Sequence, residues 1–131
     1  MPENIQVAYV EDEPSIATLL SSGLDLFGIR VIPIYMSAEE LLENLNNEDL
    51  AAADMLIFDI RLPKMTGLEL AQQLRERGEE RPLVLVSAWP RPPQAELDAI
   101  DAEFLAKPFD FADVVQKIRE LVWQGGDKKN E

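Results

Sequence analysis

Three carboxylates, one hydroxyl and one primary amine stand where short apolar runs of this chain end. They are Glu11, Asp12, Asp59, Ser87 and Lys107. The clearest case is Asp59, which ends the run Met55–Phe58. Four apolar residues in a row are typical of a strand buried on both faces of a parallel sheet, and open sheets of this kind bind ligands at the carboxyl ends of their strands. An Asp in this place can also do no more than open a loop, so the prediction depends on its four companions.

Side chains of these types, brought together, could carry out phosphoryl transfer. Two unit charges 4 Å apart repel by roughly 4 kcal/mol at an effective dielectric constant of about 20, so three adjacent carboxylates need a counter-ion. Mg²⁺, or Mn²⁺ in its place, prefers oxygen ligands and often binds through one or two carboxylates and a phosphate. Asp59 could attack a phosphorus atom, while Lys107 and Ser87 could contact the phosphate oxygens. The five residues therefore predict a metal-dependent phosphoryl site.

Composition limits the other kinds of site. The 131 residues suit one domain, and 47% of them are apolar, so a packed core is expected. The chain has neither cysteine nor histidine, which excludes disulfides, Cys/His metal sites and catalysis by an imidazole base. Its formal charge of −13 repels nucleic acid and anionic lipid. No apolar run approaches the roughly 20 residues of a membrane span and no signal peptide is visible, so we expect a cytoplasmic protein that by itself binds neither nucleic acid nor membrane.

The hydrophobic pattern predicts five strands that alternate with five helices. The strands are expected at 5–10, 30–35, 55–59, 82–87 and 103–106, and the helices at 14–27, 37–45, 66–77, 94–100 and 110–123. Pro33 places the second strand at an edge, because proline cannot donate to a central ladder. Gly125-Gly126 should end the last helix, which makes 1–124 one domain and 125–131 a polar tail or the stub of a linker. The alternation predicts an α/β fold with a doubly wound parallel sheet.

Two of the expected helices begin at a capping box. Ser37 is followed by Glu40, and Thr66 by Glu69. In this motif the hydroxyl accepts a hydrogen bond from the backbone N–H three residues later, and the carboxylate accepts one from the backbone N–H of the capping residue. We therefore expect helices to start directly after Ser37 and Thr66.

The motifs around the polar residues resemble the receiver domain of two-component response regulators. VEDEP, FDIRLPKMTG, VLVSA and FLAKPF occur in the order and context typical of that family, and the similarity extends over roughly 5–123. Each motif alone is common, but the four in order at strand ends are specific. The resemblance implies a flavodoxin-like sheet of strand order 2-1-3-4-5 and a switch operated by phosphorylation, with Asp59 as the phospho-acceptor.

The resemblance also implies the ligands of the metal. Glu11 and Asp12 match the acidic pair of the family, in which Asp12 would bind Mg²⁺ directly and Glu11 mainly through water. Asp59 itself is a ligand, and the third protein ligand would be the backbone carbonyl of Arg61.

Further positions would take part in the switch by the same resemblance. Lys107 matches the lysine of the family, and its bond to Pro108 is expected to be cis. Ser87 stands at the Ser/Thr position whose hydroxyl moves toward the phosphate, and Phe104 at the aromatic position whose ring follows it. Plain core packing is the alternative for Phe104. Gly67 matches the loop after the acceptor, where it need mark no more than a helix start or a tight bend.

Two bulky residues depart from the commonest pattern of the family. Arg61 and Trp89 come two positions after Asp59 and Ser87, beside the path of the water that hydrolyses the aspartyl phosphate in similar domains. We hypothesise that the two side chains shield the phosphate and lengthen its life. The alternative is that both point outward.

A phosphorylation switch is favoured over two other functions. In the switch, a sensor histidine kinase or a phosphotransfer protein donates to Asp59, and the face of helix 94–100, strand 103–106 and helix 110–123 binds a downstream protein; whether a phosphorylated homodimer forms is left open. A phosphate-independent docking module is disfavoured because all five site residues are present. A small-substrate phosphatase is disfavoured because Arg61 stands where the best-known enzymes of that kind have a second Asp. We therefore expect no enzyme beyond a switch that catalyses its own phosphorylation and dephosphorylation.

Overall fold

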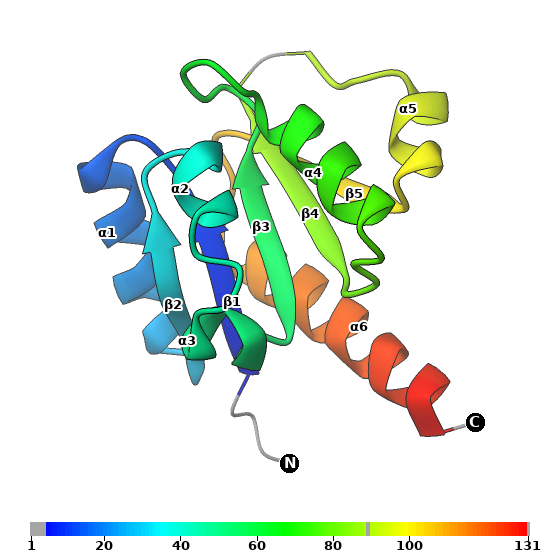
Figure 1. Cartoon of the computed structure of the whole chain (residues 1–131). Helices are drawn as coiled ribbons and strands as arrows, with labels where there is room; N and C mark the ends of the chain where they lie inside the picture. Colours follow the sequence, from blue (N-terminus) through cyan, green and yellow to red (C-terminus); the bar gives the residue numbers. More distant parts are fainter. Residues whose placement is uncertain (1–4, 89, 131) are drawn as a thin grey trace.

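Five parallel strands form one sheet at the centre of the molecule (Figure 1). The computed structural model describes residues 5–88 and 90–130, with side chains described up to residue 123. The strands are β1 (Ile5–Val10), β2 (Ile29–Tyr35), β3 (Met55–Asp59), β4 (Leu83–Ser87) and β5 (Ala102–Ala106). Their order is β2-β1-β3-β4-β5, which confirms the predicted doubly wound, flavodoxin-like fold. Because every pair of neighbours is parallel, the carboxyl ends of the strands meet at one edge, the upper one in Figure 1.

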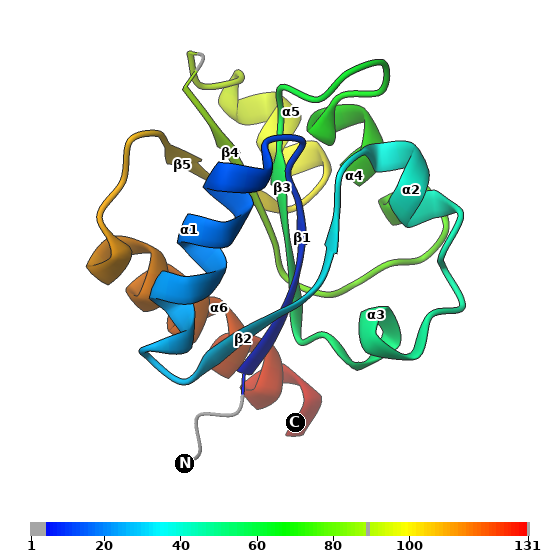
Figure 2. The same cartoon turned by 90° about the vertical axis from the view of Figure 1, so that its left-hand side faces the viewer.

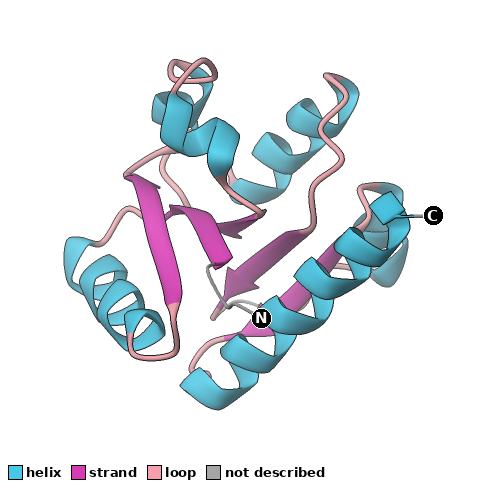
Figure 3. Ribbon diagram, turned by 90° about the horizontal axis from the view of Figure 1, so that it is seen from below, coloured by secondary structure: helices cyan, strands magenta, loops and turns pink. Residues whose placement is uncertain are grey.

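Helices cover both faces of the sheet (Figures 2 and 3). Those in the described part of the chain are α1 (Pro14–Asp25), α2 (Ala38–Leu42), α3 (Glu48–Ala52), α4 (Gly67–Glu76), α5 (Gln94–Ala99) and α6 (Phe111–Asn130). Leu24 of α1 and Ile118 of α6 belong to one apolar core, and Leu70 of α4 and Leu97 of α5 belong to the other. The sheet therefore lies between two layers of helices, with one core on each side.

The central strand β3 is buried on both faces, as its continuous apolar run predicted. Met55 and Ile57 point into the core beneath α1 and α6, whereas Leu56 and Phe58 point into the opposite core. This alternation follows from the two-residue period of a strand. A strand fixed from both sides carries Asp59 to the carboxyl edge in a defined position.

The edge strand β2 accommodates a proline. Pro33 lies within β2, which pairs only with β1 among the described strands and so forms an edge of the sheet, as predicted. The Ile32–Pro33 peptide bond is cis. The pairing register with β1 shifts between Val7 and Tyr9, next to this proline. The ladder therefore tolerates a residue without an N–H donor.

The segment expected to be one helix at 37–45 is divided into two. Ser37 caps α2 by accepting from the backbone N of Glu40 at 3.0 Å, but the carboxylate of Glu40 accepts from the backbone N of Met36 instead of Ser37. α2 ends after little more than one turn, and Asn47 starts α3 by accepting from the backbone N of Leu50 at 3.0 Å. The described part of the chain thus has six helices where five were expected. Asn is a strong N-cap, so an Asn after a short helix starts a new one.

The last helix is longer than predicted. It was expected to end at Gly125-Gly126, but α6 continues through this pair to Asn130. Each glycine in a helix costs about 1 kcal/mol relative to alanine, yet adding residues to an existing helix is far easier than nucleating one. The glycine pair was expected to end the helix, but the several helical turns before it allow the helix to continue through both glycines.

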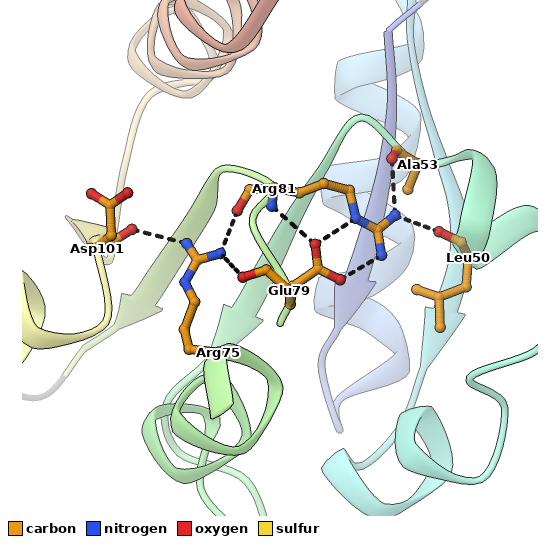
Figure 4. A network of polar contacts seen from close by, with 6 residues as sticks. All are labelled: Leu50, Ala53, Arg75, Glu79, Arg81 and Asp101. Atoms are coloured by element: carbon orange, nitrogen blue, oxygen red, sulfur yellow. Dashed lines mark hydrogen bonds and ion pairs between the residues drawn. The ribbon is translucent and has the colours of Figure 1, made fainter. Parts of the chain in front are cut away.

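Arg75 connects three segments near the amino ends of the strands, at the edge of the sheet opposite to that of Asp59. Figure 4 shows its contacts. Its Nη1 donates to the backbone carbonyls of Glu79 and Arg81, each at 2.8 Å. Its Nε donates to the carbonyl of Ile100 at 2.7 Å and its Nη2 to that of Asp101 at 3.0 Å. Burial lowers the pKa of Arg75, against the opposing effect of Asp101 and other nearby carboxylates. The guanidinium thereby ties the end of α4 to the residues that lead into β4 and β5.

Arg81 and Glu79 extend this network toward β3 (Figure 4). Arg81 Nη1 donates to the carbonyls of Leu50 at 2.6 Å and Ala53 at 3.0 Å, in the segment that leads into β3. The Glu79 carboxylate accepts from Nε and Nη2 of Arg81, both at 2.8 Å. These hydrogen bonds lower the pKa of Glu79, although burial opposes the shift. The starts of β3, β4 and β5 are therefore held together by two arginines.

Candidate functional site

Three carboxylates gather at the carboxyl edge of the sheet. Glu11 and Asp12 follow β1, and Asp59 ends the adjacent β3. One carboxylate oxygen from each lies within 4.8 Å of the other two. Glu11 and Asp59 are buried, at 0% and 5% exposure, and Asp12 is half-buried. The structure thus brings together the acidic residues that the sequence placed at strand ends.

Lys107 reaches into this group of carboxylates. Its Nζ donates to Oε1 of Glu11 at 3.0 Å and to Oδ2 of Asp59 at 3.2 Å. Burial by itself would lower the pKa of Lys107, but the hydrogen bond to Glu11 and the charges of Asp59 and Glu11 together raise it above the ordinary value. The Lys107–Pro108 peptide bond is cis, as expected. The amine is therefore held as a cation between two carboxylates.

Ser87 lies at the neighbouring strand end. It ends β4 and is 1% exposed, and its backbone carbonyl accepts from the backbone N of Lys107 at 2.9 Å. This bond aligns the ends of β4 and β5, so the residue that carries the hydroxyl and the residue that carries the amine are fixed side by side.

Arg61 approaches Asp59 through its main chain. The backbone N of Arg61 donates to Oδ1 of Asp59 at 3.1 Å, while the residue is exposed. Both residues line a cavity of about 330 Å³, whose walls also include Asp12 and Lys107. Trp89, the other residue of the shielding hypothesis, lies outside the described residues, so that hypothesis stays a prediction.

Phe104 lies on β5 and is partly buried against the core beneath α4 and α5. The guanidinium of Arg91 stands over its ring, with Cζ 6.0 Å from the ring centroid. Arg91 also donates to Oε1 of Gln94 in the first turn of α5. Both readings of Phe104, as core packing and as a switch residue, are compatible with this position.

Tyr9 is part of the site although the motifs did not indicate it. Its side chain is fully buried, and its hydroxyl donates to Oε1 of Glu11 at 3.1 Å. Burial, and next the charge of Glu11, raises the pKa of Tyr9 far above the ordinary value, so the hydroxyl remains a donor. The signal was present in the sequence, because Tyr9 is two residues before Glu11 and a buried tyrosine hydroxyl needs a hydrogen-bond partner.

Gly67 also contributes more than a helix start. Its backbone N donates to the carbonyl of Ile60 at 2.9 Å. A Cβ added to Gly67 would lie 2.8 Å from the carbonyl carbon of Asp59 and still nearer to its oxygen. Thr66 caps α4 here with the complete capping box that was predicted with Glu69. The absence of a side chain at 67 lets α4 begin directly against the backbone of Asp59.

The donor set fits a hard divalent cation. Three carboxylates face one ammonium group, Lys107, which leaves an excess of negative charge in a largely buried space. Carboxylate oxygens with room for water are the surroundings that Mg²⁺ prefers.

An apolar groove of about 400 Å³ adjoins the acidic group. It lies between the first half of α1 and the start of α6, and Ile16, Leu19 and Phe109 are among the residues that line it. Leu19 is 64% exposed. Lys107 borders both the groove and the acidic cavity, so a molecule bound in the groove would be next to Asp59.

Comparison with known proteins gives consistent results. Residues 7–119 match the family model of the response regulator receiver domain. The response regulator protein TodT of Pseudomonas putida is 32% identical over 123 residues, which are 91% of this chain and 52% of TodT. The response regulator protein TmoT of Ectopseudomonas mendocina is 34% identical over 113 residues, 84% of this chain and 49% of TmoT. The chain therefore spans about half the length of the curated relatives it matches.

Solved structures of the same fold include two with nearly complete coverage. A response regulator receiver domain protein of Methanospirillum hungatei has a TM-score of 0.82 at 23% identity and covers 96% of this chain and 99% of its own. The response regulator protein TrrA of Thermotoga maritima, solved in complex with Mg²⁺ and BeF, has a TM-score of 0.76 at 26% identity, with 89% and 98% coverage.

Proposed function

The chain belongs to the family of response regulator receiver domains, and we propose that Asp59 accepts a phosphoryl group from a sensor histidine kinase or a phosphotransfer protein. The observation that carries this proposal is the position of the Asp59 carboxylate, at the end of a buried strand, beside two other carboxylates and 3.2 Å from the Lys107 amine. Because residues 1–131 contain no histidine, the phosphohistidine would have to come from outside this segment.

In the proposed reaction an oxygen of Asp59 attacks the phosphorus atom as the bond to the donor imidazole breaks. Asp12, Asp59 and the backbone carbonyl of Arg61 would hold Mg²⁺ directly, and Glu11 would act mainly through water. When bound, the cation supplies positive charge that offsets the negative charge on the phosphoryl oxygens. Lys107 leaves its carboxylate partners to pair with a phosphoryl oxygen, as a flexible point charge can.

The proposed switch begins at Ser87. Its hydroxyl would donate to a phosphoryl oxygen, and the ring of Phe104 on β5 would move into the space that this displacement opens. The face made by α5, β5 and α6 would then bind a downstream protein, or a second copy of the chain in a phosphorylation-dependent homodimer. This chain would be a cytoplasmic switch whose only catalysis is its own phosphorylation and dephosphorylation. The acidic surface argues against contact with nucleic acid by this chain alone.

The groove beside α1 supports a protein as phosphodonor. A helical partner could bury Leu19 and Ile16 there and bring a phosphohistidine over Asp59.

In the part of the chain that the structure describes, no helix is long and apolar enough to cross a membrane.

A small phosphodonor such as phosphoramidate, with Mg²⁺ and intact-mass readout, tests the proposal. The protein should gain one phosphoryl group, and Asp59→Asn or removal of Mg²⁺ by EDTA should abolish the gain. A phosphate-independent docking module, the alternative, would gain none. A phosphatase would consume many equivalents of donor without retaining the group.

A further inference from the structure

Tyr9 and Lys107 donate to the same oxygen. Oε1 of Glu11 accepts from the Tyr9 hydroxyl at 3.1 Å and from Nζ of Lys107 at 3.0 Å. The other carboxylate oxygen, Oε2, accepts from the backbone N of Glu13 at 3.2 Å. Tyr9 and Glu11 are both 0% exposed, so this hydrogen bond is shielded from solvent. The Glu11 carboxylate is thus held by one cation and two neutral donors.

The proposed function requires the cation to leave. Lys107 has to turn from Glu11 toward a phosphoryl group on Asp59. A buried carboxylate that loses its partner is strongly destabilised unless other donors remain. Two donors do remain, the Tyr9 hydroxyl and the Glu13 N–H, and only the first is bonded to the oxygen that Lys107 releases.

We propose that Tyr9 is a positioning residue of the phosphoryl site, whose hydroxyl holds Glu11 in place and eases the transfer of Lys107 from Glu11 to the phosphoryl group. This inference rests on the proposed function. A neutral donor suits the task, because it orients the carboxylate without cancelling the charge that Glu11 directs at the metal. Tyr9 lies in β1 two residues before Glu11, and its ring is packed into the core beneath α1 and α6, so the hydroxyl is held in place.

The chain offers a matched control. Tyr35, at the end of the neighbouring strand β2, is also buried, but its hydroxyl has no hydrogen-bond partner among the described residues. Tyr9→Phe and Tyr35→Phe therefore delete the same atom at adjacent strands. Only the first deletion breaks a hydrogen bond to the site.

The test compares both variants with the wild type, using Mg²⁺ and phosphoramidate. Tyr9→Phe should lower the rate of phosphoryl gain about five- to tenfold, whereas Tyr35→Phe stays within about twofold. Without any phosphodonor, the Kd for Mg²⁺ measured by calorimetry should rise about threefold in Tyr9→Phe alone. The Tm of the metal-free protein should fall by about 5 °C more in Tyr9→Phe than in Tyr35→Phe.

A double-mutant cycle distinguishes positioning from general stability. In a Lys107→Met background there is no lysine to transfer, so Tyr9→Phe should slow phosphoryl gain by less than about twofold. An equal loss in both backgrounds, a Tyr9→Phe that behaves like Tyr35→Phe, or one that is unfolded at the assay temperature would overturn the inference. If the wild type itself gains no phosphoryl group, the proposed function fails and the role of Tyr9 with it; if only the variants behave differently from expectation, the proposed function stands.

Discussion

Gly67 and Asp59 are in contact through their main chains. A Cβ at Gly67 would lie 2.8 Å from the carbonyl carbon of Asp59, closer than the Cβ atoms of folded proteins come to such a neighbour. The loop between β3 and α4 therefore returns to the residue from which it started. The position of the nucleophile depends on a residue eight places later in the chain.

Gly67→Ala should damage both the fold and the site. The new methyl group would push α4 away from Asp59, and we expect the free energy of unfolding to fall by about 2–3 kcal/mol, in the range of overpacked cores. Phosphoryl gain should slow at least about tenfold, because the carboxylate is displaced. Urea unfolding and intact-mass kinetics measure the two effects.

Gly78→Ala is the matched control for Gly67→Ala. Gly78 has a φ of +97°, but nothing lies within 4 Å of a Cβ there, and it is at the other end of α4. Its replacement should cost roughly 1–2 kcal/mol of stability through backbone strain and leave the rate of phosphoryl gain unchanged. Equal kinetic losses in both variants would mean that the contact with Asp59 is unimportant.

Mg²⁺ should stabilise the protein through the acidic group. At a concentration ten times its Kd, a ligand that binds only the folded state adds about 1.4 kcal/mol to the free energy of unfolding, so we expect the Tm to rise by a few degrees. Asp12→Asn removes a proposed direct ligand and should abolish the rise. Asp25→Asn, an exposed substitution at the end of α1, should leave it intact. Thermal unfolding with and without Mg²⁺ decides the matter, and a rise that persists in Asp12→Asn would place the cation elsewhere.

Lys107→Met should slow phosphoryl gain by at least about tenfold, because the variant lacks the cation that would pair with the phosphoryl oxygens. Stopped-time intact-mass measurements at saturating Mg²⁺ give the rate. Lys117→Met provides the comparison, since Lys117 pairs with Glu103 at 3.2 Å on the surface between β5 and α6, away from the carboxylates. Lys117→Met should gain the phosphoryl group at the same rate as the wild type.

Glu79 makes stability sensitive to acid. Hydrogen bonds from Arg81 lower the pKa of Glu79 in the folded state below its ordinary value of 4.5. A lowered folded pKa means that the stabilisation is present above the unfolded pKa and is lost as the pH falls through the folded pKa. We therefore expect the free energy of unfolding to drop more steeply below pH 4.5 in the wild type than in Glu79→Gln, by about 1 kcal/mol.

Urea titrations at neutral and acidic pH test the role of Glu79. Glu76→Gln, at an exposed position in the last turn of α4, controls for a general effect of removing one carboxylate. The free energy of unfolding at neutral pH exceeds that at acidic pH by a certain amount in the wild type. If Glu79→Gln and Glu76→Gln reduce this amount equally, the hydrogen bonds from Arg81 to Glu79 do not cause the acid sensitivity.

Local sequence pattern predicted the five strands, the parallel sheet and the acidic group at its edge, and the resemblance to receiver domains predicted the strand order. β1 was expected at its observed bounds, because the short, mostly apolar run from Ile5 to Val10 ends at three acidic residues, a pattern typical of a buried strand. Asp59 and Lys107 come together because parallel strands bring their carboxyl ends to one edge, which is a property of the topology and not of distance along the chain.

Other features were beyond such reasoning. α3 has only five residues, too few for a helical period to show, and only Asn47 indicates its start. Arg75 bonds to backbone carbonyls, and Arg81 bonds to two of them besides the carboxylate of Glu79. Every residue has a backbone carbonyl, so the sequence does not indicate which ones these arginines contact. The bond from Tyr9 to Glu11 was missed for a different reason, since Tyr9 was considered only as one residue of the strand at 5–10.

The two oxygens of Asp59 have different neighbours. Oδ1 accepts from the main-chain N–H of Arg61, whereas Oδ2 accepts from the side-chain amine of Lys107. A half-turn of the carboxylate would exchange oxygens that are chemically identical, but it would have to break both bonds on the way. Every encounter with a phosphodonor therefore starts from the same orientation of the Asp59 carboxylate. In that orientation its two oxygens, which are equivalent in the free side chain, have different hydrogen-bond donors.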